Sequence, residues 1–318
     1  MFCIIQPMNP GVLIAAAIIV SSGISGTLGF VLAKKEPAVA ITLISPEPQT
    51  QISSFTPTSS PAVKVVPSRG LQNAIDSVLK DSVGTYAVVV KDLKTKETYT
   101  RNANLQFEAA SLYKLWVMAQ AFNEISSGDL SEDEVLSSSI TALNSSFQIP
   151  SHVAELTTGS ISMTVEQALD RMITISHNYA ALLLIEKLSL PDIKNFIESN
   201  GFTQTIIGDG SITTANDVSA FLEKIYYGQL ISSDSSAGML SLLKRQTLNT
   251  KIPKYLPTGV VIAHKTGELD NVTHDAGIVY SPKATYILII LTKSDSPPGA
   301  DERISGISQA VYSYFNPK

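Results

Sequence analysis

Apolar and polar residues recur along this chain with two different periods, and the switches between them outline a folded unit. Residues 71–81 (LQNAIDSVLKD) place apolar side chains at helical spacing, and residues 86–100 (YAVVVKDLKTKETYT) predict two strands joined by a polar turn. Helical patterns dominate from Ser111 to about Tyr227. An amphipathic helix is predicted over residues 301–315. Strands return before it, at residues 260–268, 275–281 and 284–293.

This order of elements predicts one domain of mixed α/β (α+β) class over residues 70–318. Strands at both ends of the domain predict an antiparallel sheet whose outer face is covered by the terminal helices. The middle block is expected to pack against the sheet as an all-helical lobe. Neither a second linker nor an internal repeat is visible in this range. The groove between sheet and lobe is then the natural place for a ligand.

The first 35 residues have a different pattern. Residues 11–33 (GVLIAAAIIVSSGISGTLGFVLA) carry no charge, and at about 1.5 Å of rise per residue a helix of this length can span a bilayer. The segment is long and no Lys or Arg precedes it, so we expect an uncleaved transmembrane anchor in residues 1–35. The alternative is a signal peptide cut after Ala38-Val39-Ala40. Residues 36–69, rich in Pro, Ser and Thr, predict an extended, disordered linker.

Two features give opposite indications about the orientation of the anchor. Lys34 and Lys35 follow the apolar segment, and the positive-inside rule would place that side in the cytoplasm. A long polar tether, in contrast, suits a domain held away from the outer surface of a membrane. We give the tether more weight, and expect the folded domain at the cell membrane outside the cytoplasm, or secreted if the segment is cleaved.

Composition excludes several classes of function. A net charge of -5 and a pI near 5.4 argue against a nucleic-acid partner, which would require a basic face. Cys3 is the only cysteine, so the chain has no internal disulfide and no Cys-rich zinc site. The four histidines form no H-x-x-x-H pair. We therefore expect no metal and no other cofactor, and a monomeric domain.

The pattern S-x-x-K, which can join a nucleophile to its base, occurs three times: at Ser77–Lys80, Ser111–Lys114 and Ser241–Lys244. The first and third copies fall inside predicted helices, where an ordinary structural or surface role is expected. Ser111 lies where QFEAA gives way to an apolar helical run, near unpaired backbone N–H groups and the positive end of the helix dipole. At i,i+3 spacing Lys114 shares its face. Burial lowers the pKa of a lysine, which would let Lys114 accept a proton.

Two further triplets follow in the sequence. Ser176-His177-Asn178 comes just after an amphipathic helix (TVEQALDRMI), and Lys265-Thr266-Gly267 lies within a predicted strand (VVIAHKTGE). Each triplet alone is a weak signal. S-x-x-K, S-x-N and K-T-G in this order, on a helix, a loop and a strand, make a strong combined motif.

With these motifs the chain resembles the class A β-lactamases, in the superfamily that they share with penicillin-binding D,D-peptidases. The resemblance covers about 250 residues and includes the GFTQTIIG…SITTANDVSAFL region, which looks like the family's segment around its active-site loop. It implies an α/β domain packed on an all-helical one. It also implies that a β-lactam or a D-Ala-D-Ala peptide is the substrate.

The resemblance implies three catalytic roles. Ser111 would be the nucleophile and would form an acyl-enzyme. Lys114 would accept its proton, directly or through water. Ser176 would pass that proton to the leaving nitrogen.

The resemblance implies substrate-binding roles as well. Asn178 would hydrogen-bond the amide side chain of the substrate, while Lys265 and Thr266 would hold its carboxylate. Gly267 would leave room for the substrate to lie along the strand. The backbone N–H of Glu268, with that of Ser111, would form the oxyanion hole.

Two departures from the family pattern affect the expected chemistry. His177 stands where the family most often has Asp, and we expect it to turn away from the substrate. The family's loop carries a Glu that activates the deacylating water. In residues 206–212 (IIGDGSI) of this chain the only carboxylate is that of Asp209. An Asp beside Gly is more often a turn residue. We therefore expect a serine acyl-hydrolase with weakened deacylation; the alternatives are a D,D-carboxypeptidase acting on peptidoglycan or a non-turnover sensor of β-lactams.

Other conspicuous residues receive structural interpretations. His264 precedes Lys265 on a strand, so its side chain should face the opposite way and pack in the core. His274 and Asp275 are expected to form a local polar pair, and Trp116 is expected to be core. A Ser–His–Asp triad is disfavoured because no G-x-S-x-G elbow is present.

Overall fold

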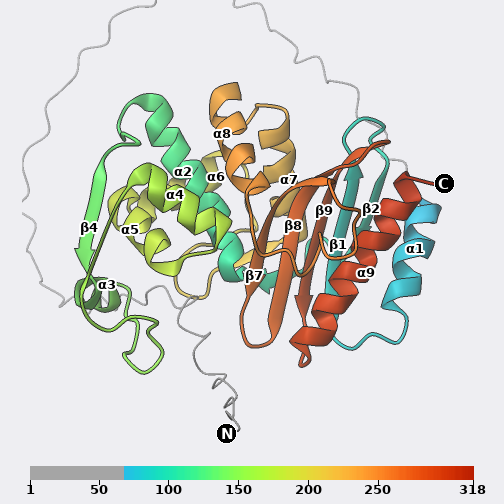
Figure 1. Cartoon of the computed structure of the whole chain (residues 1–318), viewed down its shortest axis with the longest axis horizontal. Helices are drawn as coiled ribbons and strands as arrows, with labels where there is room; N and C mark the ends of the chain where they lie inside the picture. Colours follow the sequence, from blue (N-terminus) through green and yellow to red (C-terminus); the bar gives the residue numbers. More distant parts are fainter. Residues whose placement is uncertain (1–67) are drawn as a thin grey trace, which may run out of the picture. The chain divides into compact units, whose positions relative to one another are not determined.

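The computed structural model describes residues 68–318, which belong to one compact unit. Its central feature is an antiparallel sheet with the strand order β2-β1-β9-β8-β7 (Figure 1). The strands are β1 (Thr85–Asp92), β2 (Thr98–Arg101), β7 (Val261–Glu268), β8 (Val272–Tyr280) and β9 (Thr285–Lys293). The predicted antiparallel sheet is thus confirmed, and the strand predicted to begin at residue 275 starts three residues earlier.

The register of the sheet decides which side chains face the two layers that cover it. Val89 pairs with Ile289, Ile289 with Ala276, and Ala276 with Lys265. Val89, Ile289 and Ala276 belong to the core that the sheet shares with the helical lobe. Because directly paired residues point to the same face, Lys265 shares this face.

The opposite face of the sheet is covered by the two terminal helices, α1 (Arg69–Leu79) and α9 (Pro297–Phe315), which lie side by side (Figure 1). Leu71 and Ile75 of α1 and Ile304 of α9 are fully buried against strand residues such as Val88. Side chains of β1 and β9 are therefore buried on both faces, which explains their nearly continuous apolar sequences. The predicted covering by terminal helices is confirmed.

The residues between β2 and β7 form the predicted helical lobe. Its helices are α2 (Lys114–Ser127), α3 (Ile140–Ser146), α4 (Val165–Thr174), α5 (Asn178–Leu188), α6 (Leu190–Ser199), α7 (Ala215–Tyr226) and α8 (Ser233–Lys244). Trp116 of α2 is fully buried, with its ring centroid 4.6 Å from that of Phe202 and 4.8 Å from that of Phe221. The prediction that Trp116 is a core residue is confirmed.

Two small antiparallel pairs inside the lobe were not predicted. Strand β3 (Gln106–Glu108) pairs with β6 (Ile212–Thr214), and β4 (Val135–Ser139) pairs with β5 (Ser160–Thr164). These strands are three to five residues long; β3, β4 and β5 are largely exposed, whereas β6 is mostly buried. Short partly exposed strands give little alternation of apolar and polar residues, so their partners are fixed only by tertiary contacts.

The predicted anchor in residues 1–35 and most of the predicted linker lie outside the described residues. Within residues 68–318 no helix is both long and apolar enough to cross a membrane. The last two predicted linker residues belong instead to the folded unit. Ser68 caps α1, its hydroxyl accepting a hydrogen bond from the N–H of Leu71 at 3.1 Å, and Arg69 is the first residue of that helix.

Candidate active site

Ser111 lies in a short 3₁₀ helix, η3 (Ala110–Tyr113), that leads directly into α2 at Lys114. The prediction that Ser111 lies in the first turn of the α-helix is corrected, because it lies in this tighter turn just before the helix. Ala110 has a φ of 44°, in the left-handed region that side chains with a Cβ rarely adopt. The backbone strain lies one residue before the predicted nucleophile, which is typical of functional turns.

Gly267 of β7 allows this turn to pack against the sheet. A Cβ at position 267 would lie 3.2 Å from the Cβ of Ala110 and 3.3 Å from the carbonyl oxygen of Ala109. The space that the missing side chain leaves is therefore taken by the turn that carries Ser111. The close approach between these two parts of the protein is a structural reason for glycine at position 267; that Gly267 also leaves room for a substrate along the strand stays a prediction.

Lys114 is completely buried and aims its ammonium group at the second triplet. Its Nζ donates to the carbonyl oxygen of Ser176 at 2.6 Å, to Ser176 Oγ at 3.2 Å and to Asn178 Oδ1 at 2.7 Å. Burial, and then the nearby charge of Lys265, lower the pKa of Lys114 well below its ordinary value, while the Glu155 carboxylate opposes this shift. In its neutral form Lys114 keeps two N–H groups, enough for the carbonyl oxygen of Ser176 and for Asn178 Oδ1, and has a lone pair that can accept a proton.

Ser176 lies between the two buried lysines. Its Oγ accepts a hydrogen bond from Lys265 Nζ at 2.9 Å and lies within hydrogen-bond distance of Lys114. The residue has a φ of 59° in the loop between α4 and α5. Because Lys265 Nζ donates to this oxygen, Ser176 keeps its own hydroxyl proton for donation to another group.

His177 serves the helix rather than the cavity. Its Nδ1 accepts a hydrogen bond from the N–H of Ala180 at 3.1 Å, which caps the first turn of α5. Partial burial lowers its pKa, which keeps the ring neutral and able to accept this bond. This role fits the expectation that His177 turns away from the substrate.

Lys265 is fully buried, and its pKa is lowered to about 7. Burial is the main cause and the charge of Lys251 adds to it, while Asp275 and Glu268 act in the opposite direction. Its Nζ also donates to the carbonyl oxygen of Thr266 at 2.9 Å. Lys265 is therefore near its titration midpoint at neutral pH, and an anionic ligand would shift it toward the charged ammonium form.

A cavity of about 150 Å³ joins these elements. Its lining residues are Ser111, Glu155, Ser176, Asn178, Leu248, Thr266 and Glu268. Five of the eight predicted site residues thus line one cavity. Both lysines of the prediction, Lys114 and Lys265, contact its Ser176.

Glu155 is a cavity residue that no sequence motif indicated. It lies in the segment between α3 and β5, and its carboxylate accepts a hydrogen bond from Asn178 Nδ2. Glu155 reaches the cavity through a contact with Asn178, 23 positions away, from an irregular segment. No motif with a fixed spacing marks such a contact in the sequence. Leu248, from the segment between α8 and β7, was missed for the same reason.

Lys251 is a third residue that the sequence did not reveal. It is completely buried, forms an ion pair with Glu268 and lies 3.9 Å from Asp301. Glu268 follows the K-T-G triplet and its backbone N–H is one of the two predicted oxyanion donors. The ion pair therefore holds the end of β7 at the cavity, and it balances the charge of Glu268.

Asp209 is not among the residues that line this cavity. It is exposed between Gly208, with a φ of 130°, and Gly210, with a φ of 65°. An isolated bridge between Ile206 and Ile212 closes the turn around it. Its interpretation as a turn residue agrees with this geometry.

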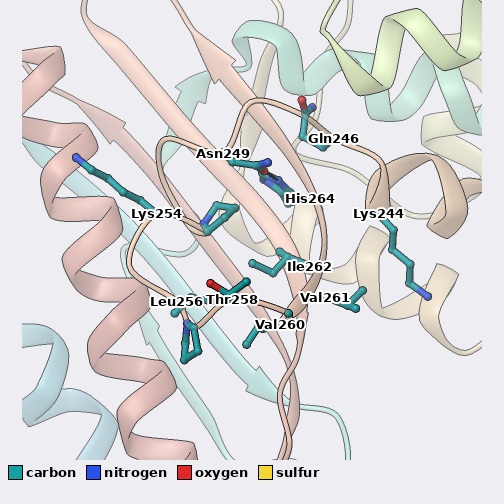
Figure 2. A pocket seen from close by; sticks show the side chains of 13 residues that line it. Lys244, Gln246, Asn249, Lys254, Leu256, Thr258, Val260, Val261, Ile262 and His264 are labelled. Carbon is teal, nitrogen blue, oxygen red and sulfur yellow. Dashed lines mark hydrogen bonds between the residues drawn. The ribbon is translucent and has the colours of Figure 1, made fainter.

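His264 and His274 face opposite sides of the sheet. His264 is buried, as predicted, with Nδ1 2.9 Å from Asp275 Oδ1 and Nε2 3.1 Å from Asn249 Oδ1. Figure 2 shows it beside Asn249 in a separate cavity of about 570 Å³. The predicted pair of His274 with Asp275 is wrong, because successive strand residues point to opposite faces.

His274 is instead bound on the face of the lobe. Its Nε2 lies 2.8 Å from the carbonyl oxygen of Glu108, and its Nδ1 accepts from the N–H of Thr292 at 3.1 Å. Burial lowers its pKa to about 4, so the ring is neutral. The Nε2–H tautomer satisfies both contacts and ties β8 to the strand that precedes the Ser111 turn.

The sequence model of the family described as the Beta-lactamase enzyme family matches residues 70–315 of this chain. The chain belongs to that family. Among curated proteins, the extended-spectrum β-lactamase PER-1 of Pseudomonas aeruginosa is 22% identical over 270 residues, covering 77% of this chain and 87% of PER-1.

Several solved structures share the fold of this chain. The β-lactamase of Sphaerobacter thermophilus superposes with a TM-score of 0.69 at 22% identity, over 78% of this chain and 97% of that one. PBP-A superposes with a TM-score of 0.68 at 23% identity, over 79% and 98%. A mutant of PBP-A has also been solved as an acyl-enzyme complex with penicillin G. At these identities the likeness concerns the β-lactamase fold.

Proposed function

We propose that this family member is an active-site serine hydrolase that opens β-lactam amides through an acyl-enzyme on Ser111. The observation that carries the proposal is the hydrogen-bond network of Lys114, a buried lysine with a lowered pKa, next to a cavity that Ser111 lines. A neutral lysine in the same turn as a serine supplies the base that a hydroxyl nucleophile requires. Family membership supports a hydrolase.

In this proposal acylation proceeds in one sequence of proton transfers. Ser111 Oγ attacks the amide carbonyl while its proton passes to Lys114, directly or through water. Ser176, which contacts both lysines, donates a proton to the leaving nitrogen as the C–N bond breaks. Lys114 then returns its proton to Ser176.

The binding residues fix the substrate around this chemistry. Lys265 and Thr266 hold a carboxylate, and Asn178 contacts the amide on the acyl side. The backbone N–H groups of Ser111 and Glu268 stabilise the oxyanion, and removing one such donor typically costs about 3 kcal/mol of transition-state stabilisation.

Deacylation is expected to be slow in the same proposal. The loop of residues 206–212 contributes no residue to the cavity, and Asp209 is exposed at its tip. This observation favours the second candidate, a D,D-carboxypeptidase acting on D-Ala-D-Ala peptides, or a sensor that stays acylated.

The deciding experiment mixes the full-length protein with nitrocefin and follows hydrolysis and intact mass together. One acyl group on wild-type protein, lost in Ser111→Ala, is the expected result. Ser77 and Ser241 are exposed serines in the other two S-x-x-K copies, so Ser77→Ala and Ser241→Ala are matched controls that should acylate normally. A protein that gives neither hydrolysis nor adduct would refute the proposal.

We also retain, as a proposal, the membrane anchor with the folded domain outside the cytoplasm. It is supported by the apolar segment of residues 11–33 and the polar segment after it. Cell fractionation with protease treatment of intact cells tests it. Digestion of the folded domain only after lysis would contradict the orientation.

A further inference from the structure

Asn178 uses both ends of its side-chain amide in the free site. Its Oδ1 accepts from Lys114 Nζ at 2.7 Å, and its Nδ2 donates to the carboxylate of Glu155. Under the proposed function this amide is also the group that contacts the acyl side of a substrate. A bound acyl group must therefore lie beside the Glu155 carboxylate or displace it from one Nδ2 proton.

The position of Glu155 is fixed by its neighbour in the chain. The N–H of Leu156 donates to Tyr179 Oη at 3.2 Å, and its carbonyl oxygen accepts from Asn144 Nδ2 at 2.8 Å. Tyr179 is buried and directly follows Asn178 at the start of α5. The segment that carries Glu155 is thus bound to the helix that carries Asn178, so the carboxylate is held at the cavity by its backbone.

The two carboxylates that line the cavity differ in their charge balance. Glu268 is paired with the buried ammonium group of Lys251. Within residues 68–318 the ion pairs do not include Glu155, and its side chain is exposed toward solvent. The acyl side of the cavity therefore carries a negative charge without an ion-pair partner, while Lys265 supplies a positive charge on the side of β7.

We propose that Glu155 is a specificity-determining residue that favours substrates bearing an ammonium group on the acyl side of the scissile amide. This inference rests on the proposed function, because it takes Ser111 as the acylated residue. Suitable substrates are β-lactams with an amine on the acyl side chain, and peptides with a free amine on the residue before the acyl group. The ammonium group forms with Glu155 the ion pair that the free protein lacks.

The test compares three penicillins that differ only in the α-substituent of a benzyl side chain: hydrogen, an amine or a carboxylate. Second-order acylation rate constants are measured at pH 6, where the amine is charged, on the full-length protein. Wild type is expected to favour the amine over hydrogen by about three- to ten-fold, given the strength of partly exposed ion pairs. The carboxylate compound should react more slowly than the hydrogen compound.

Charge variants at position 155 identify the cause of this preference. Glu155→Gln keeps an acceptor for Asn178 Nδ2 and should remove the preference, while Glu155→Lys should reverse it. Glu186→Gln is the control: it removes an exposed carboxylate from the C-terminal end of α5, the helix that carries Asn178. This variant should keep the wild-type order of the three acylation rate constants. The proposal would be overturned if Glu155→Gln kept the wild-type order of the three acylation rate constants. It would also be overturned if this variant slowed acyl release equally for all three compounds, because Glu155 would then act on the water that hydrolyses the acyl-enzyme.

A failure of the proposed function gives a different pattern. If no penicillin acylates wild type, the same three compounds are compared by calorimetric binding. The amine preference and its loss in Glu155→Gln would then still support the specificity role. Equal binding of all three compounds would refute it independently of Ser111.

Discussion

Lys114 and Lys265 are both buried, yet the proposed mechanism needs them in opposite charge states. Burial lowers the pKa of each, and the charge of Lys265 lowers the pKa of Lys114 further. The pKa of Lys114 lies well below its ordinary value, and in the proposed mechanism this lysine acts as the neutral base. Lys265, with Asp275 and Glu268 nearby, keeps a pKa of about 7 and can remain charged when a substrate carboxylate arrives. This division of roles depends on surroundings that the spacing of the motifs does not contain.

The titration of Lys265 leads to a prediction about pH. Its pKa is lowered from an ordinary value near 10.5 to about 7, so the free protein loses this positive charge as the pH rises through 7. The second-order acylation rate constant for carboxylate-bearing substrates should therefore fall above pH 7, by up to about ten-fold per pH unit. Stopped-flow acylation between pH 5 and pH 10 measures this profile.

Lys265→Arg provides the control, since arginine stays charged throughout this range. Its rate constant should be lower because the fit is changed, but the fall above pH 7 should be absent. The same alkaline fall in both proteins would assign the titration to a different group.

At the scale of elements, the contact between β7 and the Ser111 turn is the tightest structural requirement of the site. Gly267→Ala would place a Cβ 3.2 Å from that of Ala110, so the turn must shift by a few tenths of an ångström. We expect acylation to slow by about 10- to 100-fold, because small displacements of reacting groups are costly. Acylation kinetics and the thermal midpoint should be measured on the same preparation.

Gly306→Ala is the matched control for this substitution. Its Cβ would lie 3.1 Å from Val78 Cγ1, an equally close contact, but in α9 on the opposite face of the sheet. Acylation should stay at the wild-type rate. If the two variants slowed acylation equally, the effect of Gly267→Ala would be a general loss of packing.

The turn of residues 206–212 gives a second prediction at this scale. Asp209 is exposed outside the cavity, so Asp209→Asn should leave the rate of acyl release unchanged within about two-fold of wild type. The decay of the acyl adduct, followed by intact mass after removal of free β-lactam, measures this rate. Slower release by ten-fold or more would make Asp209 the deacylation base.

The predictable and unpredictable parts of the site differ in how they are encoded. Ser111, Ser176 and Lys265 could be proposed because each belongs to a short motif that lies on or directly beside an element with a clear period. Glu155 and Lys251 lie in irregular segments and reach the site through tertiary contacts. The predicted His274–Asp275 pair was wrong because it assumed that neighbours in sequence are in contact, whereas neighbouring strand residues point to opposite faces of the sheet.

On the scale of the whole molecule, the order of helices and strands was predictable because burial leaves a strong signal. Leu71 and Ile75 in α1, and the apolar runs of β1 and β9, each predict a buried face by themselves. The strand order and the pairing of β1 with β9 do not follow from any local period. They depend on contacts between residues about 200 positions apart, such as Val89 with Ile289.

Helix α1 covers the face of the sheet that lies away from the helical lobe. We therefore predict that it is essential to stability but does not affect catalysis. Leu71→Ala and Ile75→Ala each remove a fully buried side chain that packs against the sheet, and such substitutions typically cost about 2–5 kcal/mol. Together they approach the whole stability of a typical domain, about 5–15 kcal/mol, so the double variant should unfold at a far lower temperature or denaturant concentration. The molecules that remain folded at low temperature should acylate at the wild-type rate, because α1 lies on the face of the sheet opposite Lys265. Thermal melts combined with titration of acylated protein separate the two effects, and slower acylation of the folded fraction would show that α1 also positions the site.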